Sequence, residues 1–466
     1  MWCAGRGIRM VKDLMLRRML LRHIGLASVA LVAACADAGV LEGPDEVKRE
    51  GSITVQEAGR IKVENDPAAL RGRIRLTSER LAVVPVGPAA TAPRSPSDES
   101  FSLVLVAEID PPEVDGTSLQ ASHSIIKGNK AYVAYNVQGP VRKGGVDVFD
   151  VSQPDAVELV SSALFEDTDV SAIDNHGSSA LYLVAATDDP AFATPAVLEV
   201  VDLQGGKLTT TSTRIDLPSY VGTGVRVKGD RVYVTSGTGG DPVGGLSIFE
   251  RRTLELAAFD AFEDARAVDV KGDLVVAMRG TSGELRLYEK QSGGLFQTYA
   301  TGGANIPESK STVFVSDGCA FYAAGDEGLR VVELGSGAAV VTLPVPDIDG
   351  VAPEDEVTNG ASASGNLLFI ANGGAGLFVA LATHSLGSSS GTVAENDDDD
   401  GIGGGEGVSA ISSCACSSAD FGLEIIGQVQ FPDGPSANYV DSKGNLLFVA
   451  NGRGGLSIVR IDRSDG

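Results

Sequence analysis

Aromatic and basic residues are scarce in this chain. Phe, Trp and Tyr make up 5% of its 466 residues, and the single tryptophan, Trp2, lies in a segment that we expect to be removed. Lys and Arg number 37 against 62 Asp and Glu, and residues 1–34 hold six of the basic and one of the acidic residues. The rest therefore carries 31 against 61, a net charge of −30. Such a surface repels phosphate backbones, so we expect no nucleic-acid partner.

Motifs that carry catalysis are also missing. The sequence has no H-E-x-x-H and no Walker loop. It has four histidines, of which His123, His176 and His384 follow residue 34. Its glycine-rich stretches fall between strand-like runs and open no helix, so a phosphate cradle is not indicated. We therefore assign no catalytic residue.

No hydrophobic run is long enough to span a bilayer. The run at Ile24–Ala34 has 11 residues, whereas a spanning helix needs about 20. Three arginines at positions 17, 18 and 22 precede it, and Val32-Ala33-Ala34-Cys35 ends it. This segment resembles the lipobox of bacterial lipoproteins, which implies that residues 1–34 are cleaved and that Cys35 is lipidated. The alternative is an ordinary secretory signal cut nearby.

The residue after the cysteine bears on location. Ala36 stands where lipoproteins retained in the inner membrane carry aspartate, so the resemblance implies the outer membrane, on its periplasmic side or at the cell surface. Several acyl chains anchor a protein stably where one is marginal. We thus expect a lipid-anchored protein of the bacterial cell envelope whose first partner is the membrane.

Glycine is abundant, with 58 residues, and it punctuates a recurring pattern. Three short strand-like runs separated by glycine turns occur in Ser436–Asp462, in Thr358–Leu381 and in Ser122–Val151. A unit this small cannot bury both faces of its sheet alone, so its recurrence predicts stacked neighbours.

Seven copies of the pattern can be aligned on the residue at the centre of the second run. The copies follow one another in steps of 43 to 51 residues, with a last step of 79. The aligned residues are Tyr132, Tyr182, Tyr233, Val276, Tyr322, Phe369 and Phe448. A further apolar run follows each copy except the last, which predicts an all-β, seven-bladed β-propeller of four-stranded antiparallel blades.

The last copy ends before a fourth strand. The run Phe101–Asp110 precedes the first copy and has the right character, so we expect the N-terminal strand 101–110 to complete the last blade. Closure of this kind leaves no unpaired ladder between the first and last blades.

The third runs of several copies resemble one known family. Gly455–Asp462, Gly145–Val151 and Gly328–Leu334 are similar to the LVIVD repeat of secreted or surface β-propellers of bacteria and archaea. That family shares no catalytic motif, so the resemblance implies a fold and a location but no reaction.

The remaining segments complete the expected domain organisation. Residues 1–34 are a lipoprotein signal peptide, 35–100 a tether and linker, and 101–466 the propeller. Within the tether, Ile61–Val63 and Ile74–Val86 show alternation that fits a small hairpin. Residues 382–421 form an acidic insertion between the third and fourth strands of the sixth blade, and its composition predicts disorder.

One set of positions predicts a ligand site at the mouth of the central channel. Equivalent residues at the start of each inner strand are Ser122, Ala172, Thr223, Arg266, Thr312, Asn359 and Asn438. With His123 beside it, this mostly polar ring is suited to a small polar or anionic ligand. The alternative is a water-filled channel in which backbone carbonyls or a neighbouring carboxylate satisfy Arg266.

Metal and disulfide signals are weaker. Asn396, Asp398 and Asp400 match the start of a Ca²⁺ loop, but Gly407 stands where its bidentate glutamate belongs, so a solvated acidic loop is the alternative. Asp269 and Asp441 are the other candidate metal ligands. Cys414 and Cys416 fit a disulfide in an exported protein, although Cys319 leaves the connectivity open.

These observations favour a function in binding. We expect a non-enzymatic, monomeric propeller that acts as a scaffold for a protein, a glycan or another surface partner, with no cofactor beyond a possible Ca²⁺. The alternative is a metal-dependent hydrolase or lyase with its site at the channel mouth.

Overall fold

The computed structural model describes residues 53–56, 59–86, 101–137, 139–237, 242–303, 310–386, 416, 421–432 and 436–463. The chain divides into the units Met1–Arg49 and Glu50–Gly466, and all the described residues belong to the second. Apart from α1 (Pro67–Leu70), η1 (Arg71–Arg73) and η3 (Pro353–Asp355), the regular elements of these residues are strands. None of the described helices has the length and hydrophobicity to cross a membrane.

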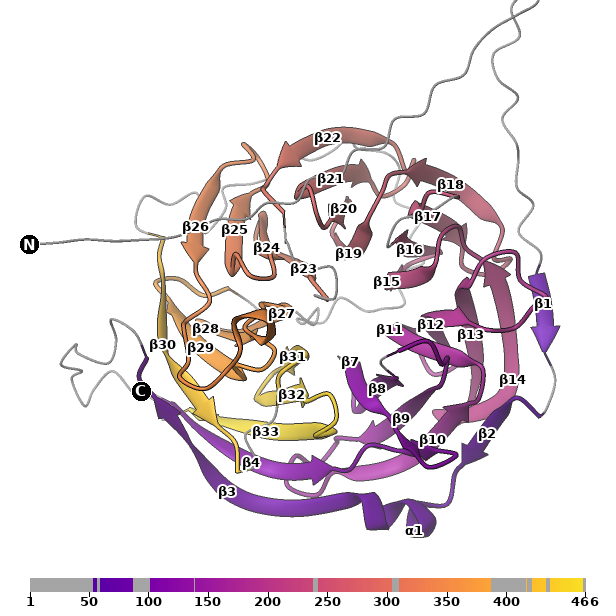
Figure 1. The fold of residues 1–466 in the computed structure, drawn as a ribbon, viewed down its shortest axis with the longest axis horizontal. Helices are drawn as coiled ribbons and strands as arrows, with labels where there is room; N and C mark the ends of the chain where they lie inside the picture. The colour runs from indigo at the N-terminus through magenta and orange to yellow at the C-terminus, as the bar shows by residue number, and fades with distance from the viewer. Residues whose placement is uncertain are drawn as a thin grey trace, which may run out of the picture. The chain divides into compact units, whose positions relative to one another are not determined.

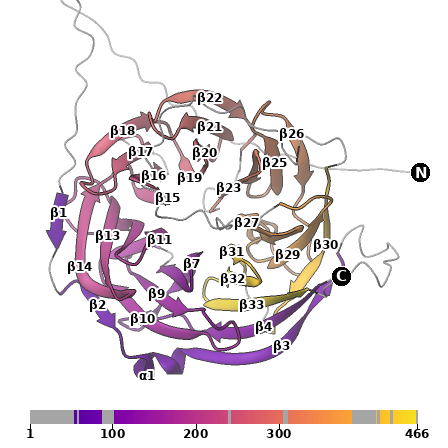
Figure 2. The same ribbon diagram turned by 180° about the vertical axis from the view of Figure 1, so that it is seen from behind.

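Over the described residues, the strands form seven four-stranded antiparallel groups, here called blades, set around a common axis (Figure 1 and Figure 2). The inner strands are β7 (Gln120–Lys127), β11 (Thr168–His176), β15 (Val221–Lys228), β19 (Ala265–Lys271), β23 (Val313–Ser316), β27 (Gly360–Ser364) and β31 (Tyr439–Lys443). The second strands are β8 (Lys130–Asn136), β12 (Ala180–Thr187), β16 (Arg231–Gly237), β20 (Leu274–Arg279), β24 (Cys319–Ala323), β28 (Leu367–Ala371) and β32 (Leu446–Ala450).

The third and fourth strands of each blade lie progressively farther from the axis. The third strands are β9 (Gly144–Asp150), β13 (Ala196–Gln204), β17 (Gly245–Glu250), β21 (Glu284–Glu289), β25 (Leu329–Glu333), β29 (Leu377–Ala382) and β33 (Leu456–Arg463). The outer strands are β10 (Glu158–Phe165), β14 (Lys207–Asp216), β18 (Leu256–Ala261), β22 (Leu295–Ala300), β26 (Ala339–Leu343), β30 (Leu423–Gln430) and β4 (Phe101–Ile109). A two-stranded ribbon, β5 (Glu113–Val114) with β6 (Thr117–Ser118), lies between β4 and β7 in the chain. The predicted all-β propeller of four-stranded blades is confirmed.

Glycine makes the turns of the repeating unit possible. Gly444, between the first two strands of the last blade, has φ of 60°, a conformation that costs glycine little. Gly455 opens the third strand with φ of 75°, and a Cβ there would lie 2.1 Å from the carbonyl oxygen of Ile109. Gly455 is therefore required both by its backbone conformation and by the close approach of β4.

The hydrophobic core lies between the blades. Among the described side chains, seven clusters each combine residues from two successive blades, and together they close the circle. Between the last and first blades, for example, Phe448 meets Phe149 edge to face with ring centroids 6.5 Å apart. Each blade therefore buries both faces only because it has a neighbour on either side, as the repeat predicts.

The strand that precedes the first blade completes the last one. β4 pairs antiparallel with β33, from Phe101 opposite Arg463 to Ile109 opposite Leu456. Leu103, Leu105 and Ile109 are buried in the adjoining cores. The prediction that strand 101–110 closes the ring is confirmed.

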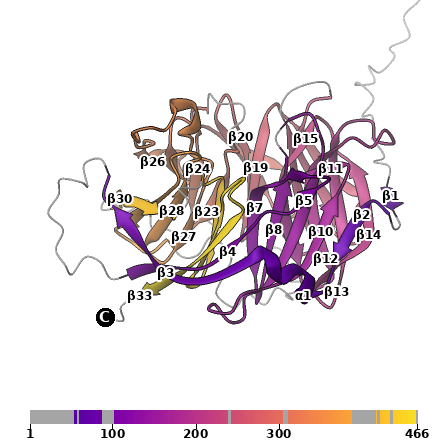
Figure 3. The same cartoon turned by 60° about the horizontal axis from the view of Figure 1, so that its bottom comes forward.

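The segment before β4 differs from its prediction as a tether. β1 (Ile53–Gln56) pairs with β14, β2 (Ile61–Glu64) pairs with β10, and β3 (Ile74–Val84) pairs with both β4 and β30. Figure 3 shows β3 passing along the outside of β4. The predicted hairpin between residues 61–63 and 74–86 is therefore wrong, because each strand pairs with a different blade. We call the segment from β1 to β3 the belt. The other residues of the expected tether lie outside the described residues.

Candidate functional site

The side chains predicted to form a ring at the channel mouth mainly make hydrogen bonds between neighbouring blades. The hydroxyl of Ser122 donates to the carbonyl of Val170 in the next blade at 3.0 Å. The hydroxyl of Thr223 donates likewise to the Ala265 carbonyl at 2.7 Å, and that of Thr312 to the Asn359 carbonyl at 3.0 Å. The sequence placed these residues correctly at equivalent positions, but their polar atoms form hydrogen bonds between neighbouring inner strands.

The other members of the ring also have protein partners. Arg266 forms an ion pair with Asp264, which corresponds to the alternative in which a neighbouring carboxylate satisfies it. The side-chain carbonyl of Asn359 accepts from the backbone N–H of Lys310 at 3.0 Å, and that of Asn438 accepts from the Ser436 hydroxyl at 3.1 Å. An anion bound by Arg266 would therefore share its guanidinium with Asp264.

The second blade departs from the predicted alignment by one residue. The inner strands of the first four blades each carry an irregularity in register at the ring position, and in β11 the extra residue is Ser171. The assignment of Ala172 to the ring was therefore wrong. The turn that follows β11 is one residue longer than the turn after β7. Because the copies were aligned on Tyr182, which follows this turn, the extra residue shifted the alignment of β11 by one position.

His123 is buried on the inner strand of the first blade. Its ring stacks on Tyr439 with centroids 4.2 Å apart, and the residue is 3% exposed. Burial holds the pKa of His123 well below its ordinary value, and the positive charges of Lys310 and Arg226 act in the same direction. His123 is therefore neutral at physiological pH, and its Nδ1 atom has no hydrogen-bond partner among the described residues.

Lys310 crosses the channel and pins two blades. It lies on the connection from β22 to β23, yet its Nζ atom donates to the carbonyls of Ser122 at 2.6 Å and Ser171 at 2.7 Å in the first and second blades. The ammonium also lies 5.4 Å from the centre of the Tyr439 ring. Loss of solvent around the amine, with Arg226 nearby, lowers the pKa of Lys310 to about 7. No sequence pattern marked this lysine, because its partners are backbone atoms of distant blades.

Three carboxylates from the inner strands each hold the next blade. Asp174, Asp269 and Asp441 accept the backbone N–H of Val227, Val315 and Ile126 at 2.7, 2.7 and 3.0 Å respectively. The second oxygen of each is also engaged, by the N–H of Asn175, by Arg226 and by the N–H of Ser442. The sequence predicted Asp269 and Asp441, which lie three residues after their ring positions. Asp174 was missed because the alignment put Ala172, rather than Ser171, at the ring position of β11.

The candidate metal ligands are therefore committed to protein donors. Both oxygens of Asp269 and Asp441 accept hydrogen bonds from protein donors, and at least one donor at each residue lies in a neighbouring blade. No group of three or more His, Cys, Asp or Glu side chains with metal-binding geometry occurs in the described part of the chain. The Ca²⁺ candidates Asn396, Asp398 and Asp400 lie outside the described residues, as does Cys35.

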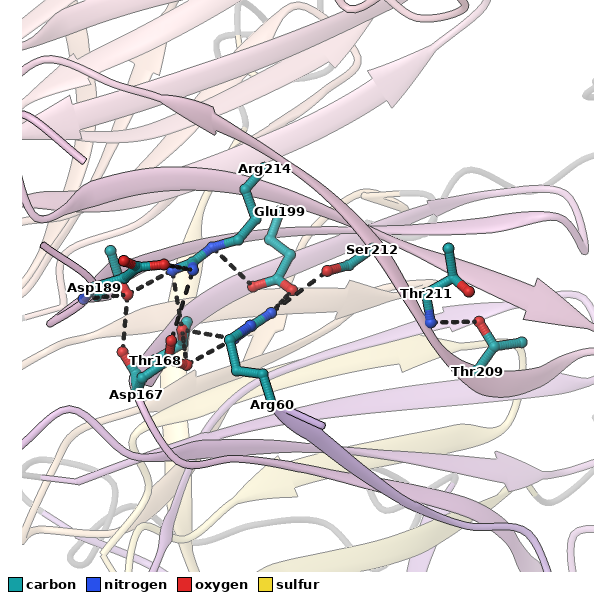
Figure 4. Close-up of polar contacts among 10 residues, drawn as sticks. Arg60, Asp167, Thr168, Asp189, Glu199, Thr209, Thr211, Ser212 and Arg214 are labelled. Atoms are coloured by element: carbon teal, nitrogen blue, oxygen red, sulfur yellow. Dashed lines mark hydrogen bonds and ion pairs between the residues drawn. The ribbon is translucent and has the colours of Figure 1, made fainter. Parts of the chain in front are cut away.

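The belt is fixed to the second blade by a buried cluster of charges (Figure 4). Glu199 in β13 and Arg214 in β14 have fully buried side chains, and Arg60 of the belt pairs with Glu199. Arg60 also pairs with Asp167 at 2.7 Å, and Arg214 pairs with Asp189 at 3.0 Å. Burial raises the pKa of Glu199, and the two guanidinium groups oppose that shift. The carboxylate therefore depends on Arg60, which the belt supplies.

A second arginine fixes the belt to the first blade. Arg73 donates from Nη1 to Asp147 Oδ1 at 3.0 Å and from Nη2 to Oδ2 at 2.5 Å, and the Asp147 side chain is 0% exposed. This two-pronged arrangement is the strongest geometry of an arginine–carboxylate pair. Arg73 also donates to the backbone carbonyl of Asp110 at the end of β4. The belt thus joins the closing strand to the first blade through one side chain.

The disulfide differs from the predicted pair. Cys416 is bonded to Cys319, 97 residues away and in the second strand of the fifth blade. The expected bond between Cys414 and Cys416 is therefore wrong. Cys319 and Cys416 are both buried in the cluster between the fifth and sixth blades. The bond ties the insertion, which leaves the sixth blade after β29, to the neighbouring blade.

The rim of the propeller is uneven. The belt covers the outer strands of the first, second, sixth and last blades. The outer strands of the other three blades carry large apolar side chains that are more than a third exposed. These are Leu256, Phe259, Leu295, Phe296 and Val340. Neither the belt nor this difference between blades was predicted from the sequence.

Comparisons with known proteins identify no family for this chain. A scan against protein-family models and a search of curated proteins gave no match. Among solved structures, the chain is similar to the computationally designed Ika8 protein, with 11% identity, a TM-score of 0.41, and coverage of 83% of this chain and 98% of the other. It is also similar to U3-55K, with 11% identity, a TM-score of 0.47, and coverage of 73% of this chain and 95% of the other. Membership of the LVIVD-repeat family stays a prediction.

Proposed function

We propose that this chain is a non-enzymatic, lipid-anchored propeller of the bacterial cell envelope that serves as a binding scaffold. The observation that carries the proposal is the use of the channel groups. Asp174, Asp269 and Asp441 each hold a neighbouring blade, and Lys310 contacts the first and second blades. Groups engaged in contacts between blades have a structural role, and the rigid disc that they hold together is suited to presenting a surface.

The anchor is proposed from the sequence around Cys35. A protein acylated there partitions into detergent after solubilisation, and the Cys35→Ser variant is released in soluble form. Cys3→Ser is the matched control, because it makes the same substitution at a different cysteine of the N-terminal segment. If the Cys35→Ser variant stays membrane-bound, the anchor proposal is wrong.

The scaffold proposal is tested against the metal-dependent alternative by metal analysis. Purified protein is dialysed against Ca²⁺ or Zn²⁺, and the bound metal is measured for the wild type and for Asp269→Asn and Asp441→Asn. The proposal predicts that the wild type holds no stoichiometric metal that is lost in either variant. Stoichiometric metal lost in either variant would instead establish a metal centre at the channel and favour a hydrolase or lyase.

A further inference from the structure

The outer edges of three blades are open to strand addition. Within the described residues, β18, β22 and β26 are the last strands of their sheets, and no further strand pairs with them (Figure 1). An edge strand presents a row of backbone N–H and C=O groups without sheet partners, which is a template for another strand. The outer strands of the other four blades pair with the belt: β14 with β1, β10 with β2, and both β30 and β4 with β3.

The edge at β22 lacks the usual protection. Its sequence, LFQTYA, contains no charge and no proline, which are the residues that natural edges use to prevent pairing. Leu295 is 42% and Phe296 45% exposed, and on the neighbouring edge Leu256 and Phe259 are each 43% exposed. Apolar side chains therefore flank an unpaired backbone along adjacent blades.

The belt shows what kind of strand these edges accept. β2 reads Ile-Lys-Val-Glu and pairs antiparallel with β10. Ile61 is buried in the cluster between the first two blades and Val63 packs against it, while Lys62 and Glu64 are exposed. Side chains that alternate between the two faces of a strand explain this pattern. An added strand should therefore alternate aliphatic with polar residues.

The net charge of the chain indicates which polar residues an added strand should carry. The net charge is −25, so a basic segment is attracted and an acidic one repelled. A second copy of this chain carries the same negative charge and would be repelled. A contact through the six residues of β22 is also small, because a stable interface buries about 1,200 Å² or more. An extended segment can instead cross successive edges, as the belt does.

We propose that β18, β22 and β26 bind an extended segment of a partner protein in which aliphatic residues alternate with lysine, arginine or threonine. The segment adds a strand to the outer edge of a blade, so that main-chain hydrogen bonds supply affinity and alternate side chains contact the exposed apolar residues. This inference rests on the proposed scaffold function and names its partner by chemistry.

A synthetic peptide that alternates isoleucine or valine with lysine and threonine tests the proposal. The probe is titrated against the full chain, and amide hydrogen exchange is followed by mass spectrometry. We expect slower exchange in β18, β22 or β26. A peptide with the same side chains but with every backbone nitrogen methylated should give no slowing, because it has no N–H donor on either edge. No slowing with the probe, equal slowing with the methylated peptide, or slowing only elsewhere overturns the proposal.

A pair of variants locates the site. The double variant Phe259→Lys/Phe296→Lys should weaken binding of the probe at least tenfold, because it removes two exposed apolar side chains from the proposed edges and adds positive charge that repels the lysines of the probe. Tyr220→Lys is the matched control, since Tyr220 is 52% exposed but lies outside these strands. Equal loss in both variants, or no loss in the double variant, contradicts the assignment. The thermal midpoint of each variant, measured alongside, shows that it is folded.

Two further outcomes separate this inference from the scaffold proposal. If sedimentation shows a dimer that the double variant dissociates, the edge binds a second copy and the partner-segment proposal is wrong. If wild type and the double variant capture the same protein from detergent extracts, the scaffold function stands and the rim site is wrong. If neither the wild type nor the double variant captures a partner, the scaffold proposal itself is wrong.

Discussion

Replacing Arg73 with alanine removes the partner of a carboxylate that solvent does not reach. Asp147 is 0% exposed, and both of its oxygens accept from Arg73. Removal of one member of a buried ion pair leaves an uncompensated charge and costs about 3–5 kcal/mol. The same substitution also removes the two hydrogen bonds to the Asp110 carbonyl at the end of the closing strand. We therefore expect Arg73→Ala to lower the free energy of unfolding by at least about 3 kcal/mol.

The assay is urea unfolding of the full chain at pH 7, followed by circular dichroism. Arg75→Ala is the matched control, because Arg75 lies two residues away and its side chain is 63% exposed in its pair with Glu108. Exposed pairs contribute about 0–1 kcal/mol. Arg73→Met combined with Asp147→Leu removes both charges together and should recover most of the loss, since an apolar pair can replace a buried ion pair with little cost.

The outcomes distinguish a fixed belt from a loosely attached one. A loss in Arg73→Ala no larger than that in Arg75→Ala would refute the reasoning, because it would mean that Asp147 is hydrated when Arg73 is absent. Failure of the double variant to recover stability would show that Arg73 acts chiefly through the Asp110 carbonyl. Recovery with a large single loss supports the buried pair as the anchor of the belt.

Three further perturbations test other parts of the structure. Deleting residues 101–110 removes a paired strand with several buried aliphatic side chains, each worth about 1.5–3 kcal/mol, so the thermal midpoint should fall sharply, and an unchanged midpoint contradicts ring closure. Cys416→Ser should lower stability by about 2–4 kcal/mol, whereas Cys414→Ser should not, and peptide mapping without reduction should recover Cys416 linked to Cys319. Burial raises the pKa of Asp441 to about 7, so the folded chain holds a proton that the unfolded chain releases near pH 4, and stability falls as pH rises between these values. The stability of Asp441→Asn relative to wild type should therefore increase from pH 4 to pH 7, and a difference that does not vary with pH would show that Asp441 is already ionised.

The blades could be predicted because their information is local. Alternating apolar residues and glycine turns mark strands within one unit, and the missing fourth strand of the last unit pointed to residues 101–110. The repeat also predicted equivalent positions such as Ser122 and Thr223, whose hydroxyls indeed make equivalent contacts between blades. What the repeat could not predict was that these contacts use up the polar atoms expected to bind a ligand.

The belt could not be predicted because its pairing is long-range. Alternation in Ile61–Glu64 indicates a strand but does not say that its partner is Ser162–Phe165, about a hundred residues away. The nearest alternating segment, Ile74–Val84, suggested a hairpin by proximity alone. Lys310 escaped notice for a related reason, since its contacts are backbone carbonyls of two blades remote in sequence.

One register difference changed the view of the channel. A single extra residue in the turn after β11 put Ala172 where Ser171 belongs and hid Asp174. Because the side-chain period of a strand is two, a shift by one residue assigns the wrong face. Turn length is not encoded in the apolar alternation, so only the paired strands could correct it.

The central claim is that the channel groups hold the blades together while the rim binds a partner. Capture from detergent-solubilised envelope tests it most directly, with three forms of the chain compared: wild type, the channel variant Lys310→Met and the rim variant Phe259→Lys/Phe296→Lys. We predict a captured protein that wild type and the channel variant retain and the rim variant loses. Capture that depends on Lys310 and is unaffected at the rim would contradict the claim.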